Sequence, residues 1–305
     1  MKKSKARFAA VWLVSTLITI VLLGGTGILL YQKYFTPESS STEESYSGDD
    51  LVFAPGEEHS QTTLFILDAG EGENNKIFVL SRFLPADGQF ILIPMPGKTF
   101  CQVNTKKTTL YEFYRTGGSS SAVSALENAL NIPIEKYMKF DRDSFNTLVD
   151  ILGGANVDLP RDFFYINPET GENTNLKKGT QLLDGNKLRQ LLTFPQFDEG
   201  EDFRTKITAS VLSDMLNGAV SERLADTLDN SFKAIINSVE TNISALDYDF
   251  RKKAIEYIIR PGTKPVTFKL PQGEYSKDKE PVFMLDSKFG EDVAYWFKVE
   301  SLMPS

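Results

Sequence analysis

The feature that most constrains this chain is a run of 24 residues without a charged side chain, Phe8 to Tyr31. As an α-helix, such a run is long enough to cross a hydrocarbon core of about 30 Å. A cleaved signal peptide has a shorter apolar segment and a small-residue cleavage site. The run therefore predicts an uncleaved membrane anchor, with late cleavage as the alternative.

Four basic residues precede this run: Lys2, Lys3, Lys5 and Arg7. Because positive residues stay on the cytoplasmic side, the main domain is expected outside the cell membrane, held by a single span. The next residues are rich in Ser and Glu, a composition typical of a disordered, self-repelling stalk. The predicted segments are a cytoplasmic N-terminus (1–7), a transmembrane helix (8–31), a stalk (32–60) and an extracytoplasmic domain (61–305).

The charge balance and the rare residues exclude several functions. All 41 acidic residues but only 29 of the 33 basic residues follow the run, so the outer part carries a net charge of −12. Such a domain has no general attraction for nucleic acid. With only one cysteine, Cys101, no internal disulfide can form. With only one histidine, His59, a histidine-based triad or a multi-histidine zinc site is excluded.

Strand and helix patterns alternate through the rest of the chain. Apolar runs such as TLFILDAG, KIFVLSRF and QFILIPMPG predict buried strands. Phe145, Leu148, Val149 and Leu152 fall on one face of a predicted helix, which Gly153 can end in the left-handed conformation. Further helices are predicted over 184–192, 203–217, 224–239 and 244–259, a strand over 266–270, and a last helix around Trp296. We therefore expect one α/β domain.

The stretch LLTFPQFDEGEDFR, residues 191–204, raises the possibility of a metal loop because it holds four carboxylates. It lacks the alternating ligands, central glycine and distal glutamate of a calcium-binding EF-hand loop. Acidic loop residues are usually solvated, so a solvent-exposed connection is the favoured interpretation. Neither a phosphate-binding glycine motif nor a GxSxG nucleophile motif is present.

Several segments together resemble the LytR–CpsA–Psr family. The most specific is FNTLVDILGGANVDLP, and YRTGGSSSAVSALENALNIPIEKYMKFD, LKKGTQLLDGNKLRQLL and SVETNISALDYDF support it. The resemblance covers about Gln61 to Trp296. It implies a central mixed β-sheet flanked by helices, with an apolar groove for a lipid tail.

The family consists of membrane-anchored phosphotransferases that move glycopolymers from a polyprenyl-pyrophosphate carrier onto peptidoglycan. Arginines and aspartates grip the pyrophosphate together with a magnesium ion. An arginine suits this task because its planar guanidinium pairs with phosphate oxygens. A metal ion neutralises charge that develops on the leaving group.

The family's phosphate-binding positions are largely substituted in this chain. Where the family has an aspartate after its first strand, this chain has Gly70, and Asp68 lies two positions earlier. The R-x-D segment is Asn74-Asn75-Lys76, and the Arg-Asp pair of the S-x-P-R-D segment is Met95-Pro96. The R-x-R segment is Thr193-Phe194-Pro195. Of the R-x-x-R-Q segment, Arg204 remains and Ile207 replaces the second arginine.

These substitutions predict a cell-envelope protein of this type with reduced or lost catalysis, a pseudoenzyme, for which no catalytic residue can be assigned. Arg204, Lys98 and Lys206 are the candidate phosphate-binding residues, and Asp68 is the candidate ligand for Mg²⁺. Polyprenyl-linked glycopolymer and peptidoglycan are the expected partners. Two alternatives remain open: an active transferase with a site rebuilt from these four residues, and a non-catalytic interaction module. Each residue also has an ordinary interpretation, as a surface charge or a turn-capping group.

Overall fold

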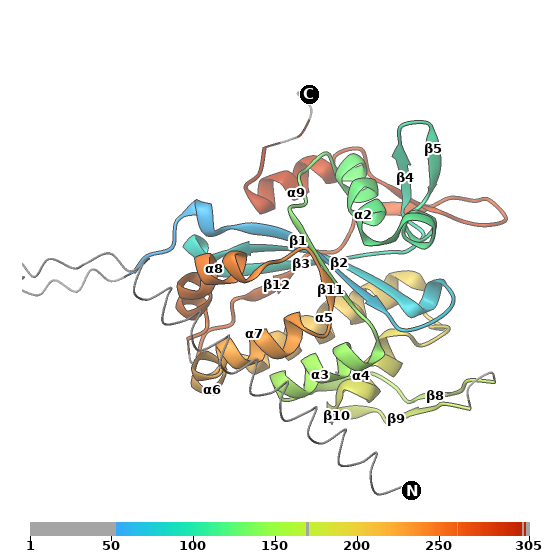
Figure 1. The fold of residues 1–305 in the computed structure, drawn as a ribbon. Helices are drawn as coiled ribbons and strands as arrows, with labels where there is room; N and C mark the ends of the chain where they lie inside the picture. Colours follow the sequence, from blue (N-terminus) through green and yellow to red (C-terminus); the bar gives the residue numbers. More distant parts are fainter. Residues whose placement is uncertain (1–52, 169–170, 261, 301, 303–305) are drawn as a thin grey trace, which may run out of the picture. The chain divides into compact units, whose positions relative to one another are not determined.

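A computed structural model describes residues 53–168, 171–260, 262–300 and 302 (Figure 1). These residues form one compact domain. The predicted anchor and most of the predicted stalk lie outside the described residues. Among the described residues, no helix is long and apolar enough to span a membrane.

A six-stranded mixed sheet forms the centre of the domain, in the order β11-β6-β1-β2-β3-β12. Strands β1, β2 and β3 are antiparallel neighbours, whereas β6 runs parallel to β1 and β12 parallel to β3. The strands are β1 (Gln61–Asp68), β2 (Lys76–Leu84), β3 (Gln89–Met95), β6 (Lys136–Phe140), β11 (Glu240–Thr241) and β12 (Val266–Phe268). The mixed sheet expected from the sequence is confirmed.

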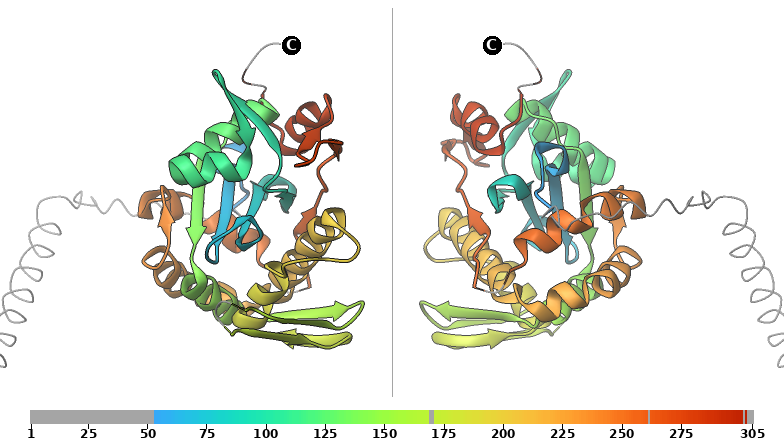
Figure 2. Two further views of the ribbon diagram at one scale, coloured as in Figure 1. Left: turned by 90° about the vertical axis from the view of Figure 1, so that its right-hand side faces the viewer. Right: turned by 90° about the vertical axis from the view of Figure 1, so that its left-hand side faces the viewer.

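Helices cover both faces of this sheet, as the edge-on views show (Figure 2). One face packs against α2 (Leu110–Leu130) and α9 (Phe289–Phe297). The other face packs against α3 (Arg142–Leu152), α4 (Gly185–Leu192) and α5 (Glu201–Ala219). The remaining helices are α6 (Glu222–Asp226), α7 (Leu228–Ile236), α8 (Ala245–Ile258) and the short 3-10 helices η1 (Glu57–His59), η2 (Glu73–Asn75) and η3 (Pro85–Asp87).

Four two-stranded sheets complete the domain. They pair β4 (Phe100–Val103) with β5 (Lys106–Thr109), β7 (Ala155–Leu159) with β10 (Gly179–Leu183), β8 (Phe163–Ile166) with β9 (Asn173–Leu176), and β13 (Gly273–Tyr275) with β14 (Phe283–Leu285).

Local sequence explains the boundaries of the helices. Asp141 caps α3 by accepting a hydrogen bond from the backbone N–H of Ser144 at 2.9 Å, and Gly153 ends the helix with a φ of 90°. The helix predicted over 224–239 is instead two helices, α6 and α7, that meet at Thr227. Helix α2 begins at Leu110, where the Thr109 side chain accepts a hydrogen bond from the Glu112 N–H, and it is kinked at Gly118, whose φ is 67°.

Candidate functional site

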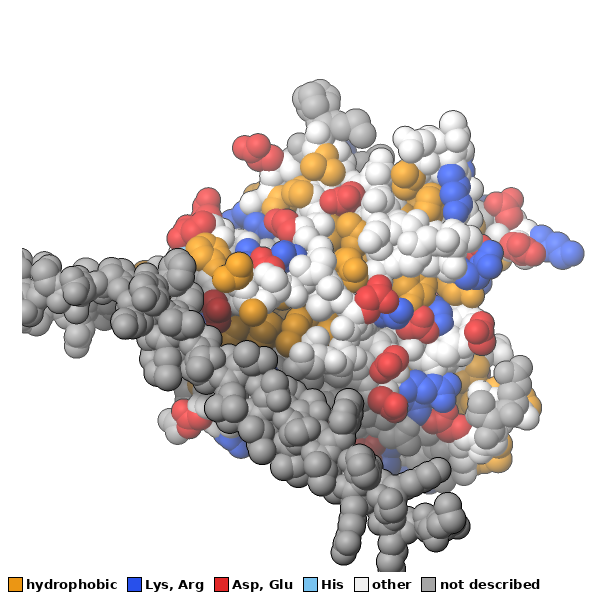
Figure 3. Space-filling model, viewed as in Figure 1, with side chains coloured by type: hydrophobic (Ala, Val, Ile, Leu, Met, Phe, Trp, Pro, Cys, Tyr) orange, Lys and Arg blue, Asp and Glu red, His pale blue; other side chains and the backbone are white. Residues whose placement is uncertain are grey.

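The sheet face that carries α3, α4 and α5 is hollow. Two adjoining cavities run along it, which we call the inner chamber, about 250 Å³, and the outer chamber, about 330 Å³. Five residues line both cavities and form a neck between them: Phe65, Phe90, Met138, Leu216 and Phe232. The space-filling view shows hydrophobic side chains in a hollow between α7 and α8 (Figure 3).

Strand alternation produces the apolar floor of these chambers. Successive side chains of a strand point to opposite faces, so Phe65 and Leu67 of β1 face the chambers while Leu64 and Ile66 belong to the opposite core. Helix α5 contributes the wall with Leu212, and helix α7 contributes Phe232. Chambers built this way suit a long apolar ligand.

A polar basin lies at the inner end of the chambers. It consists of a hollow of about 370 Å³ and a smaller one of about 50 Å³, and Glu73, Asn74, Lys98 and Glu201 line both. Ile77 lines both the smaller hollow and the inner chamber, so the basin and the chambers adjoin. The remaining residues of the basin that bear on its chemistry are Arg142, Glu172, Arg189, Thr193, Pro195, Arg204 and Tyr275.

Two arginines of the basin share one carboxylate. The Arg189 guanidinium, whose side chain is only 5% exposed, donates a hydrogen bond to Glu172, and Nη1 of Arg142 lies 3.8 Å from Oε2 of the same residue. The hydrogen bond from Arg189 lowers the pKa of Glu172. Arg142 also donates a hydrogen bond from Nε to the carbonyl of Ala69. An anionic ligand must therefore compete with Glu172 for both guanidinium groups.

Arg204 lines the smaller hollow, where it contacts a carboxylate, a backbone carbonyl and an aromatic ring. Its Nε donates to Oε2 of Glu201 at 2.8 Å, its Nη2 donates to the carbonyl of Pro195 at 3.2 Å, and its guanidinium lies over the Phe197 ring at 4.8 Å. Its Nη1 is buried and has no hydrogen-bond partner among the described residues. A buried donor without a partner is unfavourable and would be satisfied by an incoming oxygen.

The two carboxylates next to Arg204 set the electrostatic balance of the basin. Burial raises the pKa of Glu73, although the charge of Lys98 opposes this effect, and Glu201 lies close enough to raise it further. Lys98 is half-buried and lines both hollows. Five cationic side chains (Lys76, Lys98, Arg142, Arg189 and Arg204) and three carboxylates (Glu73, Glu172 and Glu201) thus line the basin.

The structure places only two of the four residues selected from the sequence in the basin, Lys98 and Arg204. Lys206 is exposed and lines neither hollow. Asp68 lies on the opposite face of the sheet, where Tyr114 of α2 donates a hydrogen bond to it at 2.5 Å and Lys76 forms an ion pair with it. Burial would raise the pKa of Asp68, but these two hydrogen bonds outweigh burial and lower it.

Described residues offer no ready-made metal cage. Nowhere among them do three or more His, Cys, Asp or Glu side chains gather as a metal site. Three of the four carboxylates of the acidic stretch are instead divided between two arginines. Asp198 and Glu199 lie 3.5 and 3.0 Å from Arg161, and Glu201 pairs with Arg204.

Most of the positions at which the resemblance indicates a substitution line the basin. Asn74, Thr193 and Pro195 line the larger hollow, and Met95 and Pro96 line the smaller one. Ile207 and Gly70 are exceptions: Ile207 packs in the hydrophobic core, and Gly70 lines neither hollow. The positions inferred from the resemblance thus converge in space, as expected for one ancestral site.

Sequence reasoning missed Arg142, Arg189 and Glu172. Arg189 could have been identified from its spacing, because it lies four residues before Thr193, one turn earlier in a predicted helix. In the structure the Thr193 N–H donates a hydrogen bond to the Arg189 carbonyl, and the two residues lie on one face at the end of α4. A cation lost at Thr193 can be replaced from one helical turn away. No comparable signal marks Glu172, which the β8–β9 hairpin connection brings to the basin.

Comparisons with known proteins agree with this geometry. Residues 78–276 match the model of the LytR_cpsA_psr family. The chain is 23% identical over 244 residues to the polyisoprenyl-teichoic acid–peptidoglycan teichoic acid transferase TagU of Bacillus subtilis, covering 76% of this chain and 78% of that protein. Its fold is similar to the crystal structure of B. subtilis TagV, with a TM-score of 0.64, 20% identity, and coverage of 78% of this chain and 96% of that one. It is also similar to a Eubacterium siraeum protein described as a transcription regulator, with a TM-score of 0.72, 22% identity, and coverage of 85% and 98%.

Proposed function

Because the chain belongs to the LytR–CpsA–Psr family, we propose that it is a membrane-anchored cell-envelope protein that binds a polyprenyl-linked glycopolymer, with its transferase activity reduced or absent. The relative TagU of B. subtilis is named as a polyisoprenyl-teichoic acid–peptidoglycan teichoic acid transferase. The observation that carries the proposal is that an apolar cavity adjoins a basin whose three arginines, Arg142, Arg189 and Arg204, are already paired with carboxylates.

The apolar chambers support binding of the lipid. A polyprenyl tail gains about 0.8 kcal/mol for each methylene group removed from water. The inner chamber begins beside the basin, so a tail can enter it while its pyrophosphate stays among polar groups. The uncharged N-terminal run would hold the domain at the membrane surface where such lipids reside.

The basin supports a weak grip on the pyrophosphate. Lys98 and the unpartnered Nη1 of Arg204 can donate to phosphate oxygens directly. Arg142 and Arg189 can do so only after they give up Glu172. Each charge-assisted hydrogen bond to the pyrophosphate contributes roughly 1.5–3 kcal/mol to binding. The net contribution of Arg142 and Arg189 is smaller, because each must first lose its ion pair with Glu172.

The same side chains account for the proposed loss of catalysis. Transfer of a phosphoryl group depends on fixed cations that neutralise charge as it develops in the transition state. Thr193, Pro195 and Met95 carry no charge at positions where the family has arginine. The nearby carboxylates of Glu73 and Glu201 would repel that developing charge.

The alternative of an active transferase gains support from one observation. Five cationic side chains surround the basin, which is more than the sequence alone suggests: Lys76, which is paired with Asp68, and Lys98, Arg142, Arg189 and Arg204. The rebuilt site would then use Arg142 and Arg189 in place of Lys206 and Asp68. The interaction-module alternative has less support, because it does not explain why the domain contains two apolar chambers.

The test is binding of a labelled polyprenyl pyrophosphate to the purified chain, with and without Mg²⁺, followed by a transfer assay with peptidoglycan. We expect binding without transfer. The variant Arg204→Gln should weaken binding about tenfold or more, whereas the matched variant Lys206→Gln should leave it unchanged. Transfer would establish the active alternative, and absence of binding in both conditions would leave only the interaction module.

A further inference from the structure

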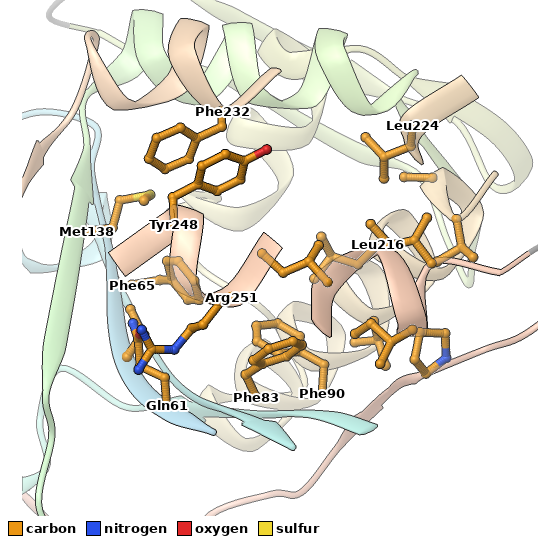
Figure 4. Close-up of a pocket in the computed structure, with 18 of the residues that line it drawn as sticks. Gln61, Phe65, Phe83, Phe90, Met138, Leu216, Leu224, Phe232, Tyr248 and Arg251 are labelled. Carbon is orange, nitrogen blue, oxygen red and sulfur yellow. The ribbon is translucent and has the colours of Figure 1, made fainter. Parts of the chain in front are cut away.

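The neck divides the apolar cavity into two chambers, and only the inner chamber adjoins the basin. The inner chamber adjoins the basin through Ile77, whereas the outer chamber is reached from the basin past the neck. Two aromatic rings of the neck, Phe65 and Phe90, meet edge to face with their centroids 6.4 Å apart. A third ring, Phe232 of α7, stacks on Tyr248 of α8 at 3.9 Å between centroids (Figure 4).

The outer chamber is polar on one side, and the rest of its wall is apolar. Gln61 and Arg251 lie together on one side of it (Figure 4), where Nε of Arg251 donates to the carbonyl of His59 at 3.1 Å. Its wall comes from the end of α5, from α6 and from the second half of α8; the residues are Ala219, Val220, Leu224, Ile255, Ile258 and Ile259. Almost every atom that a ligand would touch there belongs to a hydrocarbon side chain.

We infer that the outer chamber determines how long an isoprenoid chain this protein accepts. This inference rests on the proposed function, because a head group held in the basin fixes the end from which the tail is measured. A short tail would fill the inner chamber and stop at the neck. Only a longer tail would pass Phe65 and Phe232 and gain further apolar burial in the outer chamber.

A small residue in the outer wall makes the inference testable. Ala219 is 6% exposed and lines the outer chamber but not the inner one. In the variant Ala219→Phe the new ring would occupy the outer chamber and leave the inner chamber and the basin intact. Filling an existing cavity is generally compatible with folding. Leu224→Trp is a second blocking variant, on a half-buried position of another helix.

The experiment measures binding of farnesyl pyrophosphate, a short ligand, and undecaprenyl pyrophosphate, a long one, to the full chain. We expect the long ligand to bind at least about tenfold more tightly than the short one. Either blocking variant should remove this advantage without changing the affinity for farnesyl pyrophosphate. The same change at an exposed position of α8, Ala245→Phe, is the control and should alter neither affinity.

A second measurement is a long ligand with a photoreactive group at the end of its tail, followed by mapping of the labelled peptides. We expect labelling of the α5 end and of α8 around Ile255 in the unaltered chain, and its loss in Ala219→Phe. Equal weakening of both ligands by the blocking variants, or labelling elsewhere, overturns the inference alone. Failure of the unaltered chain to bind either ligand overturns the proposed function together with it.

Discussion

The two faces of the central sheet use alternating residues of the same strands, yet they differ in how they are filled. On one face Leu64, Leu80 and Ile93 pack against α2 and α9 and are fully buried. On the other face Phe65 and Phe90 remain half-buried and border the chambers. The filled face supplies stability, and the hollow face keeps apolar surface available for a ligand.

The largest expected effect tests this contrast with one residue type on both faces. Phe289→Ala, in α9 on the filled face, should lower the free energy of unfolding by about 3–5 kcal/mol, because it leaves a cavity in a close-packed core. Phe65→Ala should lower it by only about 1–2 kcal/mol, since that ring already borders empty space. Chemical denaturation of the two variants gives both values. Equal losses would mean that the hollow face is as tightly packed as the filled one.

A second prediction restores charge on the hollow face. Thr193→Arg should strengthen binding of inorganic pyrophosphate roughly tenfold to a hundredfold, because it adds a guanidinium to the basin. Titration calorimetry measures the change. The matched variant Thr180→Arg adds the same charge on the exposed strand β10. If both variants strengthen binding alike, the gain reflects net charge and not the basin.

A third prediction concerns the carboxylate that competes with the ligand. Glu172→Gln should strengthen pyrophosphate binding severalfold, because Arg189 and Arg142 lose their ionic partner. It should also lower stability by about 1 kcal/mol, because the buried Arg189 charge is then less well compensated. Calorimetry and thermal denaturation give the two results. Glu240→Gln breaks a comparable pair with Lys139 away from the basin and should leave binding unchanged.

The smallest expected effect is a pH dependence of stability. Burial alone would raise the pKa of Asp247, but hydrogen bonds from Lys136 and Ser244 outweigh it and lower the pKa from 3.8 to about 2. A depressed pKa in the folded state stabilises the protein above pH 4, and this contribution is lost as the pH falls from about 4 to about 2. Asp247→Asn should remove about 1 kcal/mol at neutral pH and flatten the stability curve in this range. An unchanged slope in acid denaturation would contradict it.

The sequence predicts the elements of the fold better than the site. Hydrophobic patterning suffices for β1, β2, β3 and α3: the sheet is covered on both faces, so these strands are continuous apolar runs, and α3 has a single apolar face. It fails for the β4–β5 hairpin, whose Lys106 and Lys107 are exposed and leave little apolar pattern. It also merges α6 with α7, because the break at Thr227 involves neither glycine nor proline.

The site is formed by segments that are distant in the sequence. The sequence alone therefore does not predict which side chains meet there. The resemblance identifies Thr193, Pro195 and Met95 as substituted positions, and the structure places them around one basin. That Arg142 and Arg189 meet Glu172 becomes visible only after folding, because the hairpin connection carries Glu172 across to them. Asp68 was a natural choice from its position at the end of β1, but strand alternation directs it to the opposite face.

Helix α7 closes one side of the chambers although none of its residues is buried. It is fastened at the surface, where Asp229 accepts hydrogen bonds from the Tyr248 hydroxyl at 2.6 Å and from Lys252 at 2.7 Å. Segments with few buried contacts open by local unfolding at a fraction of the global free energy, and their amide hydrogens exchange correspondingly fast. A lipid could thus enter from the side while the central sheet keeps its protection, and amide exchange in α7 would report each opening.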